Sequence, residues 1–245
     1  MNRFIVDKVE AKDKVIILND PAQLHHLRDV LRIKPLEKVG IFDNSGNEYI
    51  CVLLEAGAGA ARLEIKERKA ASDPGVSLTI ACAIPKKVKM GDIVDKLTQL
   101  GVECIIPLET ERVIVRLDKQ KKIERLQRWE KIALSAAKQS QRSRLAQIKP
   151  ISVLKDVLSS GDEFDLKLIP TLEGRRKTLK EVFSQECKKI RKVIVLIGPE
   201  GDFSRAEVAL AKKSGFLPVS LGRQVLRVDT AAIAAASFIK LNETY

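Results

Sequence analysis

A loop near the carboxyl terminus has residue types and spacing suited to holding a ligand. Residues 193–197 are apolar and mostly β-branched, which is typical of a buried strand in a parallel sheet. They lead into Gly-Pro-Glu-Gly-Asp-Phe at residues 198–203, and Ser204 with Glu207 then matches the capping-box pattern that starts a helix. Open parallel sheets bind ligands where strand ends face helix starts, and glycine lets backbone approach a ligand closely.

A second loop repeats this arrangement. Residues 217–221 predict a short strand, and the loop that follows begins with Gly222. Asp229 or Thr230 is then suited to capping a last helix over residues 231–241. We expect the two loops to lie side by side and form one cleft. Neither contains the Gly-x-Gly-x-x-Gly of dinucleotide sites or the Gly-Lys-Ser/Thr of a P-loop, which argues against a doubly wound enzyme with a nucleotide cofactor.

The elements that must position these loops divide the chain in two. Residues 73–245 predict an α/β domain, in which a βαβ unit is expected to pair its strands in parallel. Its further strands are expected at 76–84, 102–107 and 165–170, and its helices at 89–100, 121–141, 178–189 and 204–214. Residues 1–72 predict a small β-barrel with one helix. Its strands are expected at 15–18, 38–42, 49–55 and 61–68, its helix at 21–32 and a hairpin turn at 43–47.

The charge of the chain indicates a polyanionic partner. The formal net charge is +12, and the stretch from Arg112 to Pro150 holds twelve Lys and Arg residues against three Asp and Glu. Such an excess suits nucleic acid. Aromatic residues make up only 4% of the chain, so stacking of bases on aromatic side chains is excluded as the main binding mode.

Cysteine and histidine usage excludes other classes of site. The four cysteines, Cys51, Cys82, Cys104 and Cys187, are scattered and form no Cys-x-x-Cys pair, so we expect reduced, buried, structural thiols. The only histidines are the adjacent His25 and His26, which argues against a metal site and a serine hydrolase. No apolar run approaches the ~20 residues of a spanning helix, and the first residues lack the apolar core of a signal peptide. We therefore expect a cytoplasmic protein.

The ordered motifs resemble one family over nearly the whole chain. Residues 197–201, the capped helix, Leu221-Gly222-Arg223 and residues 226–231 resemble the signature of SPOUT methyltransferases. More narrowly, they resemble the RsmE family, the 16S ribosomal RNA uridine-N3 methyltransferases. Further matches follow in order: Arg3-Phe4, His26-Leu27, Gly46-Asn47-Glu48-Tyr49, Leu100-Gly101-Val102, Arg128-Trp129 and Gln139-Ser140.

The resemblance implies a fold, a cofactor and a partner. Residues 1–72 would form a PUA-like β-barrel that helps hold RNA, and residues 73–245 a SPOUT domain with a deep trefoil knot. S-adenosylmethionine would lie bent in the knot, and the family forms homodimers. The implied RNA partner is the 16S ribosomal RNA of the small subunit. The residues implied to bind the cofactor are Leu172, Ile197, Gly198, Gly201, Leu221, Gly222, Val225, Leu226, Arg227 and Thr230.

The implied reaction removes the N3 proton of uracil before or during methyl transfer. A carboxylate is needed to accept the proton and an arginine to stabilise charge on the uracil oxygens. We expect Arg227 in the second role and either Glu200 or Asp229 in the first. The chain departs from the family at Asp202, where a second glycine is usual, and at Asp229 and Gln99, where glutamate is usual.

Six arginines are the candidates for RNA binding: Arg3, Arg28, Arg32, Arg112, Arg142 and Arg144. Each phosphate contact should steepen the salt dependence of binding. Two other functions stay open at this point. One is a related SPOUT enzyme that methylates a ribose 2′-hydroxyl or a guanine. The other is a non-catalytic RNA-binding factor in ribosome assembly, which would not bind the cofactor.

Overall fold

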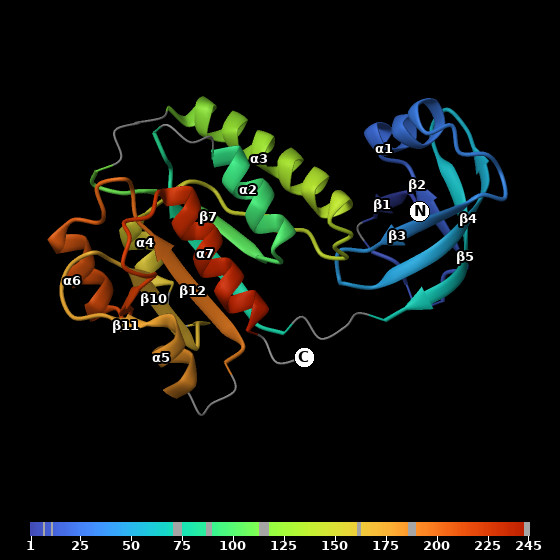
Figure 1. Ribbon diagram of the computed structural model, residues 1–245. Coiled ribbons are helices and arrows are strands. Elements are labelled where there is room, and N and C mark those ends of the chain that lie inside the picture. Colours follow the sequence, from blue (N-terminus) through green and yellow to red (C-terminus); the bar gives the residue numbers. More distant parts are fainter. Residues whose placement is uncertain are drawn as a thin grey trace. The chain divides into compact units, whose positions relative to one another are not determined.

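The computed structural model divides the chain into two compact units (Figure 1). One comprises residues 1–74 together with 137–145, and the other residues 75–136 and 146–245. The structure describes residues 1–6, 8–10, 12–70, 75–86, 90–112, 118–160, 163–185 and 190–242. The predicted boundary between residues 72 and 73 lies outside the described residues, as does Cys187.

The N-terminal unit is built on a five-stranded sheet with the order β1-β3-β4-β5-β2. Strands β1 and β3 pair in parallel and the other neighbours are antiparallel. The strands are β1 (Arg3–Ile5), β2 (Val15–Leu18), β3 (Lys38–Phe42), β4 (Glu48–Ala56) and β5 (Ala61–Lys69). The predicted strands are thus present, and β1 was missed because three residues are too few to show a pattern. Cys51 is fully buried in this sheet.

The predicted single helix over residues 21–32 differs in form. It begins as α1 (Pro21–His25), capped by the Asp20 carboxylate, and continues as the π-helix η1 (His26–Val30). Leu24 and Leu27 are buried against the sheet, as the apolar spacing predicts. The helix ends before Arg32, whose φ of 53° is left-handed and stops helical hydrogen bonding.

The predicted turn at residues 43–47 is a hairpin organised around a buried carboxylate. Asp43, 2% exposed, accepts hydrogen bonds from the Ser45 amide at 3.1 Å and the Tyr49 hydroxyl at 2.8 Å. At the tip of the hairpin, the side-chain oxygen of Asn44 accepts a hydrogen bond from the Leu145 amide at 2.8 Å. This contact ties residues 137–145 to the N-terminal unit.

The C-terminal unit contains a parallel sheet with the order β11-β13-β10-β12-β6-β7-β8, and β9 also pairs with β7. Parallel pairing of β6 with β7 confirms the predicted βαβ unit. The strands are β6 (Ser77–Ala83), β7 (Cys104–Glu109), β8 (Gln147–Ile148), β9 (Ser152–Val153), β10 (Leu166–Pro170), β11 (Lys177–Thr178), β12 (Lys192–Ile197) and β13 (Leu217–Ser220).

Helices cover both faces of this sheet, because alternate residues of its strands point to opposite faces. In β12, Val193, Val195 and Ile197 join the core that contains α2, α3, α5 and α7, whereas Ile194 and Leu196 join the core that contains α4 and α6. The helices are α2 (Met90–Gln99), α3 (Lys119–Gln139), α4 (Leu154–Ser159), α5 (Leu179–Gln185), α6 (Arg205–Lys213) and α7 (Val228–Leu241). Within the described residues, no helix is long and apolar enough to cross a membrane.

The last helix begins earlier than predicted. We expected it over residues 231–241 with Asp229 or Thr230 as its cap, but α7 starts at Val228 and its N-cap is Arg227. No side chain supplies a cap hydrogen bond there. The prediction failed because Asp and Thr are favoured at N-caps, whereas here the helix starts three residues earlier than predicted.

Candidate functional site

A pocket lies in the C-terminal unit where the carboxyl ends of β10, β12 and β13 meet the start of α7. Because these strands are parallel neighbours, the loops that follow them are brought to the same edge of the sheet. The pocket is lined by Pro170, Thr171, Leu172, Arg176, Ile197, Gly198, Pro199, Glu200, Asp202, Val219, Ser220, Leu221, Gly222, Gln224, Val225, Leu226, Val228 and Ala231. Both predicted loops therefore contribute to one cleft.

The pocket gathers most of the residues that the resemblance implied for the cofactor. Leu172, Ile197, Gly198, Leu221, Gly222, Val225 and Leu226 line it, whereas Gly201, Arg227 and Thr230 are not among its lining residues. Sequence reasoning missed Thr171 and Arg176, which follow β10. The predicted strand at 165–170 was a signal for them, since its parallel neighbours carry the two loops that were recognised.

Three glycines of the site differ in their packing and backbone conformation. A Cβ at Gly198 would lie 3.0 Å from the ring of Phe203, so glycine is favoured there by the packing of the loop on itself. Gly201 points its open side toward Arg112 instead of the pocket. Gly222 has a φ of 127°, a conformation that only glycine adopts without strain.

Carboxylates fasten the loop after β12 and the start of α6 to neighbouring loops. A Glu200 carboxylate oxygen accepts the Lys86 amide at 2.9 Å, in the loop after β6. The Glu207 carboxylate accepts the amides of Glu111, after β7, and Ser204, at 2.9 and 2.8 Å. Ser204 in turn accepts the Glu207 amide at 3.2 Å, which confirms the predicted capping box. The loop is thereby held from the β6 and β7 side of the sheet.

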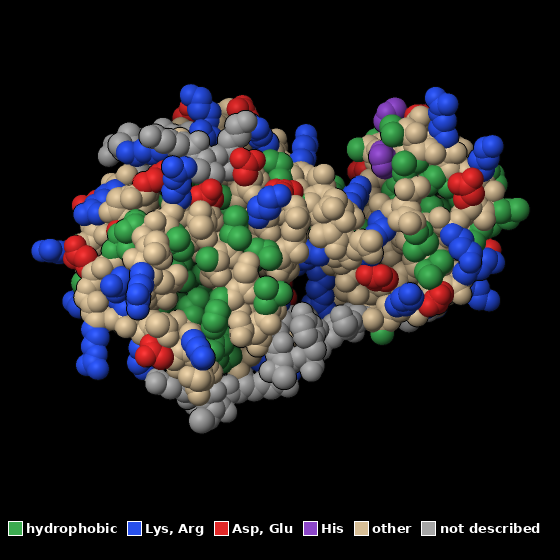
Figure 2. All heavy atoms as spheres, viewed as in Figure 1, with side chains coloured by type: hydrophobic (Ala, Val, Ile, Leu, Met, Phe, Trp, Pro, Cys, Tyr) green, Lys and Arg blue, Asp and Glu red, His purple; other side chains and the backbone are tan. Residues whose placement is uncertain are grey.

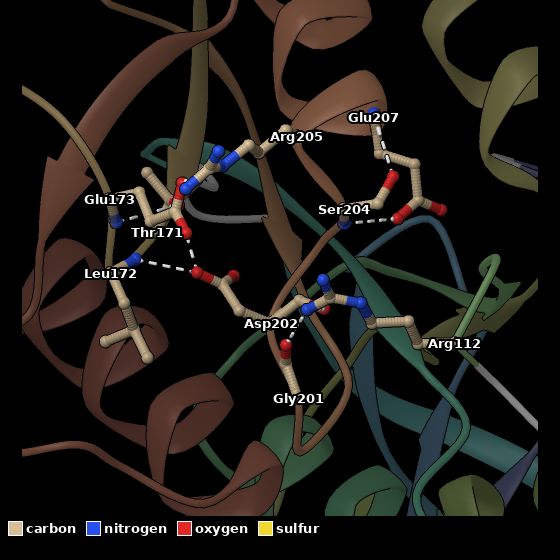
Figure 3. A network of polar contacts seen from close by, with 9 residues as sticks. All are labelled: Arg112, Thr171, Leu172, Glu173, Gly201, Asp202, Ser204, Arg205 and Glu207. Atoms are coloured by element: carbon tan, nitrogen blue, oxygen red, sulfur yellow. Dashed lines mark hydrogen bonds and ion pairs between the residues drawn. The ribbon is translucent and has the colours of Figure 1, made fainter.

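The predicted RNA-binding residue Arg112 also contacts this loop. Its guanidinium donates hydrogen bonds to the carbonyl oxygens of Gly201 and, at 3.5 Å, Asp202 (Figure 3). Arg112 is nevertheless exposed. Its side chain is therefore part of the support of the loop, a role that charge counting could not reveal.

The three candidate catalytic residues differ in their surroundings. Glu200 is exposed and lines the pocket. Asp229 is half-buried, and its Oδ1 atom is inaccessible to water and has no hydrogen-bond partner. Arg227 is exposed at the start of α7.

The two carboxylates affect a buried thiol. Cys82, fully buried near the end of β6, has a pKa raised by burial and raised further by the charges of Asp229 and Glu200. The thiol is therefore protonated at neutral pH, as expected for a structural cysteine. Within the described residues, no group of three or more His, Cys, Asp or Glu side chains could hold a metal ion.

The remaining candidate RNA-binding arginines lie in the N-terminal unit. Arg3 is engaged in contacts within the sheet. It pairs with Glu48 at 2.9 Å, and its side chain is only 13% exposed. Its guanidinium carbon lies over the Phe42 ring, 5.4 Å from the ring centroid. Arg28 is exposed but pairs with Asp29 at 2.8 Å, and Arg32 is exposed. Arg142 and Arg144 are half-buried. Figure 2 shows Lys and Arg side chains on the visible face of each unit, with Asp and Glu side chains among them.

Comparisons with known proteins agree with this arrangement. An RNA methyltransferase domain model matches residues 72–240, and an RNA methyltransferase PUA domain model matches residues 12–66. Ribosomal RNA small subunit methyltransferase E of Mesomycoplasma hyopneumoniae is 32% identical over 235 residues, which are 95% of this chain and 96% of that one.

Two further relatives carry the same name. The Bacillus subtilis protein is 27% identical over 221 residues, covering 89% of this chain and 86% of that one. The crystal structure of the Neisseria gonorrhoeae protein bound to S-adenosyl methionine is 27% identical, with a TM-score of 0.85 over 98% of this chain and 97% of that one. The predicted fold class, an α/β methyltransferase domain with a PUA-like domain before it, is confirmed.

Proposed function

The chain belongs to the family of ribosomal RNA small subunit methyltransferase E, and from this premise we propose that it methylates N3 of a uridine in 16S ribosomal RNA. S-adenosylmethionine is the methyl donor, as in the bound relative. The observation that carries the proposal is the pocket formed by the loops after β10, β12 and β13, at the carboxyl edge of the parallel sheet.

The residues of the pocket fit this cofactor. Two large apolar side chains of its lining, Val225 and Leu172, are 71% and 49% exposed, so they offer apolar surface that a bound purine would cover. When bound, S-adenosylmethionine supplies an electrophilic methyl group on a sulfonium.

Side chains of the protein assist removal of the N3 proton of uracil, so that N3 can accept this methyl group. We assign the proton-accepting role to Glu200, because Glu200 lines the pocket, whereas Asp229 is not among its lining residues and has a buried oxygen. The guanidinium of Arg227 stabilises negative charge on the uracil oxygens as the proton leaves. Holding the two reactants in line contributes much of the remaining acceleration.

The RNA is held by the charge of the chain outside the pocket. The match of residues 12–66 to a PUA domain of RNA methyltransferases supports a role of the N-terminal unit in RNA binding. We propose phosphate contacts at Arg28, Arg32, Arg142 and Arg144. Arg3 and Arg112 instead contact other groups of the protein. A homodimeric state, a trefoil knot and a cytoplasmic location complete the proposal.

Methylation of a defined substrate tests the function. Small subunits and free 16S RNA from a strain that lacks this gene are incubated with the protein and methyl-labelled S-adenosylmethionine, and nucleosides are analysed by mass spectrometry. We expect one labelled N3-methyluridine per 16S RNA. Label on a ribose or on guanine would instead assign the chain to another SPOUT activity. Absence of both label and cofactor binding in calorimetry would favour the assembly factor.

A further inference from the structure

Asp202 occupies a backbone conformation that glycine would adopt with less strain. Its φ is 60°, in the left-handed region, within the loop that joins β12 to α6. A side chain at a left-handed position persists where its contacts compensate for the strain. The contacts of Asp202 therefore point to its role.

The carboxylate of Asp202 reaches the loop after β10, thirty residues earlier in the chain (Figure 3). Its Oδ2 accepts the Leu172 amide at 2.8 Å and the Thr171 hydroxyl at 3.1 Å. Its Oδ1 accepts the Phe203 amide at 2.8 Å within its own loop. Thr171 is 5% exposed, so its part of the link is sheltered from water, where a charge-assisted hydrogen bond retains its strength, whereas Leu172 is 49% exposed.

A second link between the same loops lies outside the pocket and is much more exposed. Arg205, at the start of α6, pairs with Glu173 at 3.0 Å, and their side chains are 88% and 63% exposed. An exposed ion pair of this kind contributes little. Asp202 is thus the stronger of the two connections, and Asp202, Thr171 and Leu172 all line the pocket.

We propose that Asp202 is a positioning residue that joins two walls of the cofactor pocket and fixes Leu172 before S-adenosylmethionine binds. This inference rests on the proposed function. A pocket wall that is ordered in advance loses less conformational freedom on binding, so the affinity for the cofactor rises. Asp202 acts through Leu172 and does not hold the reacting atoms, so it should influence cofactor binding more than the rate at saturation.

The test compares Asp202→Gly with Asp202→Asn in the full chain. Glycine suits the backbone but removes the link, so we expect the Kd and KM for S-adenosylmethionine to rise about tenfold, with kcat within about twofold. Asparagine tolerates the left-handed conformation and its amide oxygen accepts the Leu172 amide, so affinity should return to within about threefold of wild type. Calorimetry measures Kd, and methyl transfer gives KM and kcat.

Two further variants separate the link from a general loss of structure. Thr171→Val removes one partner, and we expect its effect on Kd to be largely absent in the Asp202→Gly background, because both changes break the same link. Arg205→Gln breaks the exposed ion pair and should leave Kd unchanged. Thermal unfolding of each variant without cofactor checks that the fold persists.

The results distinguish the inference from the function on which it rests. An Asp202→Gly variant that binds S-adenosylmethionine as tightly as wild type, or that loses kcat instead of affinity, would overturn the positioning role alone. A wild-type protein that does not bind S-adenosylmethionine would overturn the proposed function and the positioning role with it. Weaker binding by Asp202→Gly with rescue by Asp202→Asn supports the inference.

Discussion

The two loops that form the pocket are held in opposite ways. The loop after β12 is fastened by Glu200, Asp202 and Glu207 to the loops after β6, β10 and β7. The loop after β13 is far less restrained. In the described part of the chain, side-chain hydrogen bonds of residues 220–226 run only between Ser220 and Gly222, and Val225 is 71% exposed.

We call the loop after β12 the fixed wall of the pocket and the loop after β13 its adaptable wall. The fixed wall presents the proposed base Glu200 in a set position, which general base catalysis requires. The adaptable wall offers apolar side chains that can close on the cofactor, and it leads to Arg227 at the start of α7. We therefore expect substitutions on the two walls to have different kinetic signatures.

The largest expected effect comes from the base on the fixed wall. Glu200→Gln keeps an oxygen for the Lys86 amide but cannot accept a proton, so kcat should fall about 10²- to 10⁴-fold with cofactor affinity nearly unchanged. Asp229→Asn is the matched variant and should lose less than about tenfold. Single-turnover methylation and calorimetry measure both. The reverse ranking would move the base to Asp229.

Arg227, at the end of the adaptable wall, should have the next largest effect. Arg227→Ala removes the charge that stabilises the uracil oxygens, so kcat is expected to fall about 10²- to 10³-fold. Because Arg227 does not line the pocket, the Kd for S-adenosylmethionine should stay within about twofold. Arg223→Ala, an exposed cation in the same loop, serves as the control. Normal turnover by Arg227→Ala would remove its catalytic role.

The smallest expected effect concerns the support of the fixed wall. Ser204→Ala breaks the capping box of α6 and should lower the free energy of unfolding by about 1 kcal/mol. Urea denaturation measures this change, and Ser204→Thr should restore most of it. Since the loop keeps its links through Glu200 and Asp202, cofactor affinity should hardly change. A large loss of affinity would show that the wall depends on the helix cap.

Sequence patterns predicted the main elements because their physical signals are local. The apolar run at residues 193–197 and the Ser204–Glu207 spacing were sufficient to place β12 and α6. The two-residue strands β8, β9 and β11 carry too few residues for any periodicity. The π-helix η1 has the same apolar face as the α-helix predicted there, so spacing could not separate them.

The location of the candidate site could be predicted from the sequence, but the contacts between its residues could not. Strand ends followed by glycine indicated the cleft, and the family resemblance supplied Leu172. The link from Asp202 to Leu172 spans thirty residues, and its partner group is a backbone amide that every non-proline residue possesses. Likewise, the need for glycine at position 198 arises from the Phe203 ring and becomes visible only in three dimensions.

The assignment of residues 137–145 to the N-terminal unit affects how the protein can be divided. The polypeptide leaves that unit at residue 74, re-enters it at 137 and leaves again at 145, so a single cut cannot separate the two halves. The methyltransferase half expressed alone would contain the nine residues 137–145 without Asn44, which they contact in the whole chain. Clean dissection therefore requires a short linker from residue 136 to residue 146, with residues 137–145 supplied to the other half.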